Sequence, residues 1–215
     1  MPVLHLLTDL AAGAEPRSVT AVPAPVDGRA ALRVQLADQD AHEGLPGVDY
    51  VDQPTFMIIP AEFGTGTIEV DLRAGLTATA PDFARGFAGL AYHLVDGGYR
   101  FEAVYLRPLN GSPLDPPAPR HLRAVQYFAY PDWPFSRLRE TYPEGVYEAG
   151  ADIVPDRWIH LTLVVTDSTV VVTVDDVDVL TVHEPKSAVV PGAIGLFVDI
   201  GTRAEFASLT VEPSS

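Results

Sequence analysis

Residues 66–74 read GTIEVDLRA, and their side chains alternate between apolar and polar. One side of an extended chain then carries Ile68, Val70 and Leu72, while the other side carries Thr67, Glu69, Asp71 and Arg73. A period of two is typical of a β-strand with one buried and one polar face. The stretch therefore predicts an antiparallel sheet that contacts water on one side.

Similar stretches, rich in Val, Ile, Leu, Thr and aromatic residues, recur along the chain. They cover residues 29–36, 86–95, 99–107, 123–130, 158–166, 169–182, 192–200 and 204–212. Turn residues separate them, and no window of 12 or more residues has a helical period; residues 136–140 suit one helical turn. Strands without alternating helices predict an all-β sandwich of two packed antiparallel sheets, with residues 1–215 as one domain.

The composition restricts the class of protein. The net charge of −15 argues against nucleic acid and anionic membranes as partners, because both attract basic surfaces. No cysteine is present, which excludes disulfides, thiolate zinc sites and cysteine nucleophiles. The apolar run near the N-terminus is interrupted by Asp9 and lacks a preceding basic residue, so we expect a soluble, cytoplasmic protein. A homo-oligomer is left open.

Charged residues occur inside the predicted hairpin AYHLVDGGYRFEAVY (91–105). A two-residue turn at Gly97-Gly98 would place His93 opposite Glu102 and Ala88 opposite Arg107. A turn at Asp96-Gly97 would instead place Arg100 opposite His93. Cross-strand neighbours lie about 4.5–5.5 Å apart at Cβ, so both registers give His93 a charged partner.

A second polar cluster lies in RAVQYFAYPDWPFSRLRE (123–140), where planar donors stand beside aromatic rings. Arginine forms bidentate contacts with anions, and aromatic faces stack on sugar rings. Six of the 14 basic residues fall within 100–139, which points to an anionic or polyhydroxylated ligand. Two alternatives stay open: the arginines form ordinary ion pairs, and Trp133 with Phe135 plugs the edge of the sandwich.

The order of the segments resembles the concanavalin A-like lectin/glucanase superfamily, more narrowly its laminin-G-like and keto-glycoside-hydrolase-like bacterial sandwiches. The segments that carry the resemblance are GTIEVDLRA (66–74), GLAYHLVDGGYRFEAVYLRP (89–108), DRWIHLTLVVTDSTVVVTVDDVDVL (156–180) and GAIGLFVDIGTRAEFASLTV (192–211). The resemblance covers about residues 60–212, with 19–36 as opening strands. It implies a jelly roll whose concave sheet holds a carbohydrate. The E-x-D-x-x-E strand of the superfamily's glucanases is absent, so their mechanism is not carried over.

Two hypotheses for the function follow. The first is an enzyme, a hydrolase or lyase acting on a glycoside or sugar-derived substrate, with Glu102 and His93 as the acid–base pair. Its substrate-binding residues would be Tyr105, Arg107, Gln126, Tyr127, Trp133, Arg137 and Arg139, roofed by a long loop over about 108–122 and the segment 130–135. A glycosidase would need a second carboxylate about 5–10 Å away, for which Asp132, Glu140 and Glu148 are candidates.

The second hypothesis is a non-catalytic carbohydrate-binding module, or a small subunit of a hetero-oligomeric enzyme. We favour the enzyme, because the chain starts with methionine and leaves no room for a catalytic partner domain. No cofactor is expected, since the sequence lacks a P-loop, a dinucleotide fingerprint and H-E-x-x-H. No metal is expected either: Asp175, Asp176 and Asp178 lack EF-hand spacing and suit a solvated hairpin turn.

Overall fold

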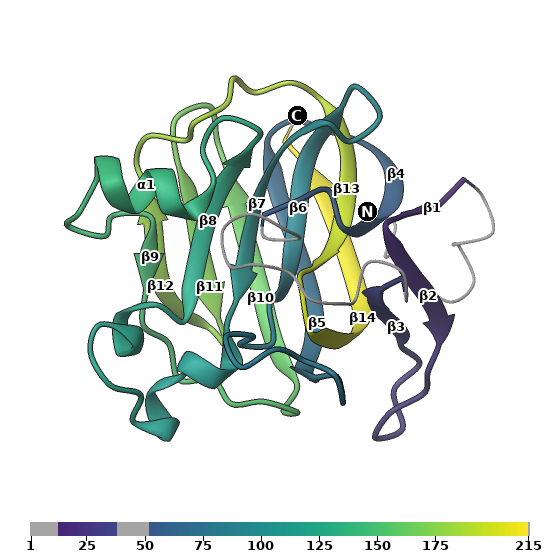
Figure 1. Ribbon diagram of the computed structural model, residues 1–215. Helices are drawn as coiled ribbons and strands as arrows, with labels where there is room; N and C mark the ends of the chain where they lie inside the picture. The colour runs from purple at the N-terminus through teal and green to yellow at the C-terminus, as the bar shows by residue number, and fades with distance from the viewer. Residues whose placement is uncertain (1–12, 38–51, 215) are drawn as a thin grey trace.

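The computed structural model describes residues 13–37 and 52–214, which form two antiparallel sheets of seven strands each (Figure 1). The apolar run around Asp9 lies outside the described residues. The β7 sheet has, in spatial order, β1 (Glu15–Arg17), β4 (Phe56–Phe63), β13 (Gly192–Val198), β6 (Ala88–Val95), β7 (Arg100–Leu106), β8 (Val125–Tyr130) and β9 (Glu148–Ala149). The β5 sheet has β12 (Val177–Val182), β11 (Val170–Val174), β10 (Ile159–Val165), β5 (Gly66–Leu76), β14 (Thr202–Pro213), β3 (Leu32–Leu36) and β2 (Val19–Pro23).

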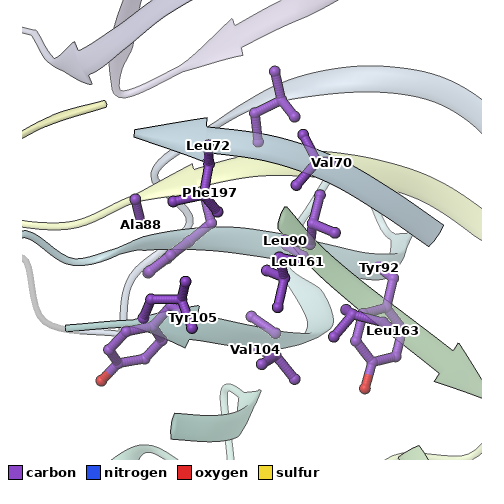
Figure 2. Close-up of a cluster of buried hydrophobic side chains, with 14 of the residues drawn as sticks. Val70, Leu72, Ala88, Leu90, Tyr92, Val104, Tyr105, Leu161, Leu163 and Phe197 are labelled. Carbon is purple, nitrogen blue, oxygen red and sulfur yellow. The ribbon is translucent and has the colours of Figure 1, made fainter. Parts of the chain in front are cut away.

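The core lies between the two sheets and confirms the alternation predicted for residues 66–74. Ile68, Val70 and Leu72 are fully buried, while the residues between them remain partly exposed. Figure 2 shows side chains of both sheets in one cluster; it includes Val70, Leu72, Leu161 and Leu163 of the β5 sheet and Leu90, Tyr92 and Val104 of the β7 sheet. The prediction of an all-β sandwich of antiparallel sheets is therefore confirmed.

The predicted strands correspond to observed strands, and residues 169–182 form a hairpin, β11 and β12. Asp175 and Asp176 at its turn both have positive φ, as a two-residue type I′ turn requires. Residues 136–140 lie in the helix α1 (Phe135–Thr141). Strand β4 was not predicted; it contains Pro60, which is tolerated because β1 pairs only with residues 56–58.

Both registers predicted for the β6–β7 hairpin are wrong. Tyr92 lies opposite Glu102, Val95 opposite Arg100, and Ala88 opposite Leu106 rather than Arg107. The ladder is irregular between Tyr92 and Val95, and His93 there has a φ of 54°. This bulge adds one residue to β6 and changes the direction of the His93 side chain. An alternating sequence pattern does not predict such a shift.

Replacing Leu72 with alanine tests the predicted alternation. We expect Leu72→Ala to lower the free energy of unfolding by about 2–5 kcal/mol, because it leaves a cavity between the sheets. The matched variant Glu69→Ala, on the opposite face of the same strand, should change it by no more than about 0.5 kcal/mol. Urea denaturation measures both. Similar losses in the two variants would contradict the assignment of faces.

Candidate functional site

A pocket of about 220 Å³ lies where β7 ends and the chain enters a series of short turns. It is lined by Phe83, Arg85, Phe87, Tyr105, Arg107, Asn110, Arg120, Arg123, Phe135 and Arg139. Five of these residues are arginines and four are aromatic. They come from the connection before β6, the end of β7, the 3₁₀ turns η3 (Pro108–Asn110) and η5 (Arg120–Leu122), and the helix α1, which lies beside β8 (Figure 1).

Arg107 is buried in the pocket wall, with a side chain only 5% exposed. Its Nη2 donates to the Tyr105 hydroxyl at 2.8 Å and to Gln126 Oε1 at 3.2 Å. Its guanidinium carbon lies 4.9 Å from the centroid of the Tyr105 ring and 5.6 Å from that of Phe135. Hydrogen bonds and aromatic rings together therefore fix the direction of this guanidinium.

Glu148 of β9 forms ion pairs with three of the pocket arginines. Its carboxylate oxygens lie 3.6 Å from Arg107 Nη1, 3.0 Å from Arg123 Nε and 2.6 Å from Arg139 Nη2. The carboxylate side chain is only 6% exposed. One buried negative charge thus holds three positive groups that arise from separate segments.

The segment 108–122, predicted as a long loop, folds into η3, η4 (Ser112–Leu114) and η5. Asn110 organises it: Nδ2 donates to the Arg123 carbonyl at 2.9 Å, and Oδ1 accepts from Arg120 Nε at 3.0 Å. The backbone at Gly111 packs so closely that a Cβ there would lie 1.7 Å from the Ile153 carbonyl oxygen. Only glycine fits this contact, which fixes the position of Asn110 in the pocket.

Two buried carboxyl groups lie behind Tyr105. Asp52 accepts a hydrogen bond from the Tyr105 hydroxyl at 3.2 Å, and Asp199 accepts one from the Asp52 backbone N–H at 2.9 Å. Burial raises the pKa of Asp52 to about 6. Burial, with the nearby charge of Asp52, raises the pKa of Asp199 to about 8. Asp199 therefore stays largely protonated at neutral pH.

The structure brings four of the predicted site residues together at this pocket. Tyr105, Arg107 and Arg139 line it, and Gln126 supports it from behind by accepting hydrogen bonds from both arginines. Three others, His93, Glu102 and Tyr127, lie on the opposite face of the same sheet. The division follows from strand geometry, because residues an odd number of positions apart on a regular strand point to opposite faces. Glu102 and Tyr105 are three apart, and Gln126 and Tyr127 are neighbours.

The second group forms a hydrogen-bonded network between the two sheets. His93 Nδ1 lies 2.8 Å from Glu102 Oε2, and His93 Nε2 lies 2.6 Å from the Gly64 carbonyl oxygen. Tyr127 donates its hydroxyl proton to Glu102 Oε1 and accepts a bond from the Lys186 backbone N–H. The side chains of His93 and Glu102 are 3% and 1% exposed, so solvent does not reach them.

The hydrogen-bond partners in this network also indicate which atoms carry protons. The Gly64 carbonyl only accepts, so His93 Nε2 must carry a proton, and one further proton is shared between Nδ1 and Glu102. Burial and the charge of Glu102 raise the pKa of Tyr127 well above its ordinary value, so Tyr127 keeps its proton. The network joins the β4–β5 connection to the segment after β12. These are structural contacts within the core, and none of the three residues lines the pocket.

Trp133 and Arg137 also lie outside the pocket lining. The backbone of Trp133 pairs with Ala129 through two hydrogen bonds of 2.7 and 3.0 Å. Arg137 stacks over the Trp133 ring at 4.2 Å, and Lys186 lies 5.2 Å from the same ring. Of the residues considered as a second carboxylate, Glu148 is ion-paired beside the pocket, whereas Asp132 and Glu140 are exposed and do not line it.

Several residues of the pocket are missing from the predicted set of substrate-binding residues: Phe83, Arg85, Phe87, Asn110, Arg120, Arg123 and Phe135. Phe83, Arg85 and Phe87 belong to the connection PDFARGF (81–87), which follows no period. The mixture of aromatic and basic residues beside a strand is the one sequence feature that could have indicated a role of this connection in the pocket. Arg120 and Arg123 belong to the local excess of basic residues, but nothing in the sequence separates them from surface arginines.

Residues 13–37 and 52–214 contain neither a membrane-spanning helix nor a group of residues suited to hold a metal ion. No helix in this part of the chain is long and apolar enough to cross a membrane. Nor do its histidine and carboxylate side chains gather in groups of three or more that would hold a metal ion.

Two solved structures share the fold of this chain at low sequence identity. The carbohydrate-binding module CBM66 from Bacillus subtilis matches with a TM-score of 0.56 and 15% identity, over 91% of this chain and 96% of the module. A Bacillus subtilis protein of unknown function with a galectin-like fold matches with a TM-score of 0.51 and 13% identity, over 89% and 86% of the two chains. No protein-family model and no curated protein matches the sequence. The fold is thus a galectin-like β-sandwich of two antiparallel sheets, which agrees with the sandwich that the resemblance implied.

The buried carboxyl group of Asp199 predicts a dependence of stability on pH. Its folded pKa of about 8 exceeds the ordinary value of 3.8, so between these values the folded state binds more protons than the unfolded state. The free energy of unfolding should therefore fall as pH rises from 5 to 8, by at most about 1.4 kcal/mol per pH unit from this group. Asp199→Asn should flatten the slope, whereas Asp115→Asn, at an exposed turn, should not. Equal slopes in urea titrations of all three proteins would refute this.

The close contact at Gly111 predicts a local effect of adding one methyl group. Gly111→Ala should lower the free energy of unfolding by about 1–3 kcal/mol, because the backbone must move away from Ile153. Hydrogen exchange should also become faster in residues 108–122. Gly64→Ala is the matched control, since its Cβ would meet Pro191 at an ordinary 3.4 Å. Unchanged exchange in the Gly111 variant would show that the turns do not depend on this contact.

Proposed function

We propose that this protein binds a carbohydrate in the arginine-lined pocket and does not cleave it. The observation that carries the proposal is the composition of the pocket: fixed guanidinium donors stand beside the rings of Phe83, Phe87 and Phe135. Guanidinium groups donate to ring oxygens and hydroxyls, while aromatic faces cover the apolar face of a sugar ring. Pockets of this kind bind ligands through apolar walls and a few oriented polar groups.

The fold supports the same proposal. CBM66, whose fold this chain shares, is by its name a carbohydrate-binding module. Its low identity transfers no site residue, so the argument for this pocket rests on the pocket's own side chains. The volume of about 220 Å³ lies below the roughly 300–1,000 Å³ of common small-molecule pockets, which suits one monosaccharide unit.

Binding without cleavage is favoured by the location of the residues first considered catalytic. Glu102 and His93 lie between the sheets, and each is hydrogen-bonded to protein groups on both sides. A general acid or base must reach the proton that it transfers, directly or through one water. Glu148, the carboxylate nearest the pocket arginines, is already bound by three of them. A glycoside hydrolase or lyase remains the alternative.

Arg107 provides the test of binding. Isothermal titration against a panel of monosaccharides and soluble polysaccharides should identify a ligand, and Arg107→Gln should weaken its binding more than tenfold, because a buried hydrogen-bonding charge is lost. Glu102→Gln, on the other face of the sheet, should keep the affinity within about twofold. Circular dichroism confirms that each variant is folded.

The same panel distinguishes binding from catalysis. Product analysis of each sugar after incubation with the wild-type protein should show no cleavage. If the wild type releases product and Glu102→Gln abolishes that release, the protein is an enzyme and the proposal fails. If Arg107→Gln leaves the affinity unchanged, the pocket is not the binding site.

A further inference from the structure

The pocket holds more positive charge than its carboxylates balance. Of its five arginines, Arg107, Arg123 and Arg139 share the single carboxylate of Glu148. Within residues 13–37 and 52–214, Arg85 and Arg120 form no ion pair. Arg85 Nη1 donates to the carbonyl oxygens of Asp82 and Ala84, at 2.7 and 2.6 Å, and Arg120 bonds to Asn110 and the Leu109 carbonyl. These partners fix the two guanidinium groups without neutralising them.

Leu109 links the backbone of Arg85 to the guanidinium of Arg120. The Leu109 backbone N–H donates to the Arg85 carbonyl at 3.2 Å, and the Leu109 carbonyl accepts from Arg120 Nη2 at 3.1 Å. Burial, followed by the positive charges of Arg120 and Arg107, lowers the pKa of Arg85 below its ordinary value. These positive charges lie near one another where water screens them only partly, which is electrostatically unfavourable. A bound anion would remove this cost.

The acidic groups behind the pocket act on Arg107 and Arg139 rather than on Arg85 and Arg120. Asp199, with a pKa of about 8, is largely protonated at neutral pH. Asp52 is directed to the Tyr105 hydroxyl and the Phe135 backbone rather than to Arg85 or Arg120. A guanidinium has five N–H donors, and the described contacts of Arg85 use Nη1 alone. Donors therefore remain for a ligand on the side of Arg85 and Arg120.

We infer that the sugar unit bound here carries an anionic group, a carboxylate, sulfate or phosphate, which Arg85 and Arg120 hold while the aromatic walls cover the ring. This inference rests on the proposed function and adds the chemical class of the ligand. Each guanidinium is held by oxygens of its own, Arg85 by the Asp82 and Ala84 carbonyls and Arg120 by Asn110 and the Leu109 carbonyl. Planar donors held in this way match the oxygens of such a group. The volume of the pocket limits the ligand to one acidic unit, free or within a longer chain.

A matched series of small sugars tests this inference by isothermal titration. The probes are glucose and galactose, their uronic acids, their 6-sulfates and their 6-phosphates, with inorganic phosphate and sulfate alone as reference anions. At least one acidic sugar should bind at least tenfold more tightly than its neutral parent. Its affinity should fall as sodium chloride rises from 50 to 500 mM, because added ions screen the attraction. The comparison of the acids shows which anionic group is preferred.

Variants assign the preference to the two arginines. Arg85→Gln and Arg120→Gln should each reduce the preference for the acidic sugar over its neutral parent at least fivefold, because the acidic sugar loses more affinity than the neutral one. Arg120→Lys keeps the charge but loses the planar fork, so it should recover part of the preference. The control is Arg157→Gln, whose arginine is 45% exposed and pairs with Asp152 and Asp175 away from the pocket. The salt dependence of the wild type remains a test if a variant fails to fold.

The outcomes separate this inference from the proposed function. Equal binding of neutral and acidic sugars, lost in Arg107→Gln, would overturn the inference and leave the proposed function standing. Inorganic phosphate or sulfate binding as tightly as the sugar that carries it would show an anion site without sugar recognition, which overturns the proposed function. An acidic preference that persists in both Arg85→Gln and Arg120→Gln would overturn the assignment to these residues. Absence of binding to every sugar, in this series and in the larger panel, would overturn both.

Discussion

The ion pairs between Glu148 and three arginines are the interaction on which the pocket depends. Arg107 follows β7, Arg123 follows the turn η5, and Arg139 belongs to α1, so three separate segments meet at one carboxylate of β9. Without that charge, three guanidinium groups would lie together in a largely buried place, and their mutual repulsion would separate the segments. Glu148 therefore acts as an internal counterion, and it leaves the remaining two arginines of the pocket uncompensated.

A second buried carboxylate serves the other face of the same sheet. Glu102 joins His93 to Tyr127, and through them it connects the Gly64 carbonyl and the Lys186 backbone to the sheet. A charged group inside an apolar strand is strongly destabilising unless it is fully hydrogen-bonded, and here both of its oxygens have partners. The unusual polarity of residues 99–107 therefore has two explanations. Glu102 accepts hydrogen bonds between the two sheets, while Arg107 lines the pocket on the other face.

Most of the fold could be predicted from the sequence, because alternation and turn residues act locally. The strand pattern of residues 66–74 and the Asp175-Asp176 turn both depend on residues that are close to one another in the sequence. The sequence could not reveal the bulge at His93, since an inserted residue changes the register without changing the composition of the strand. Strand β4 was missed because Pro60 interrupts its pattern, although its edge-like position tolerates proline.

The residues predicted for the site fall on two opposite faces of one sheet. Whether their positions along each strand are an odd or an even number of residues apart could have separated them. Tyr105 and Arg107 share parity with each other and not with Glu102, and Gln126 differs from Tyr127 in the same way. The roles of Arg85, Asn110 and Arg120 were beyond sequence reasoning, because their positions depend on contacts such as that between Gly111 and Ile153. Trp133 and Arg137 were predicted from their chemistry, but Arg137 of α1 stacks on the Trp133 ring outside the pocket lining.

Most of the side chains that line the pocket stand on connections between strands rather than on the strands themselves. Phe83, Arg85 and Phe87 precede β6, and Asn110, Arg120 and Arg123 lie between β7 and β8. Connections tolerate replacement better than strands, because their side chains contribute less to the interior. The side chains that line the pocket and the strands that form the core thus belong largely to different parts of the chain. A protein engineer could therefore exchange lining side chains such as Phe83, Arg85 and Arg120 to change the chemistry of the pocket, while Gly111 and Arg123 keep the contacts that hold the turns in place.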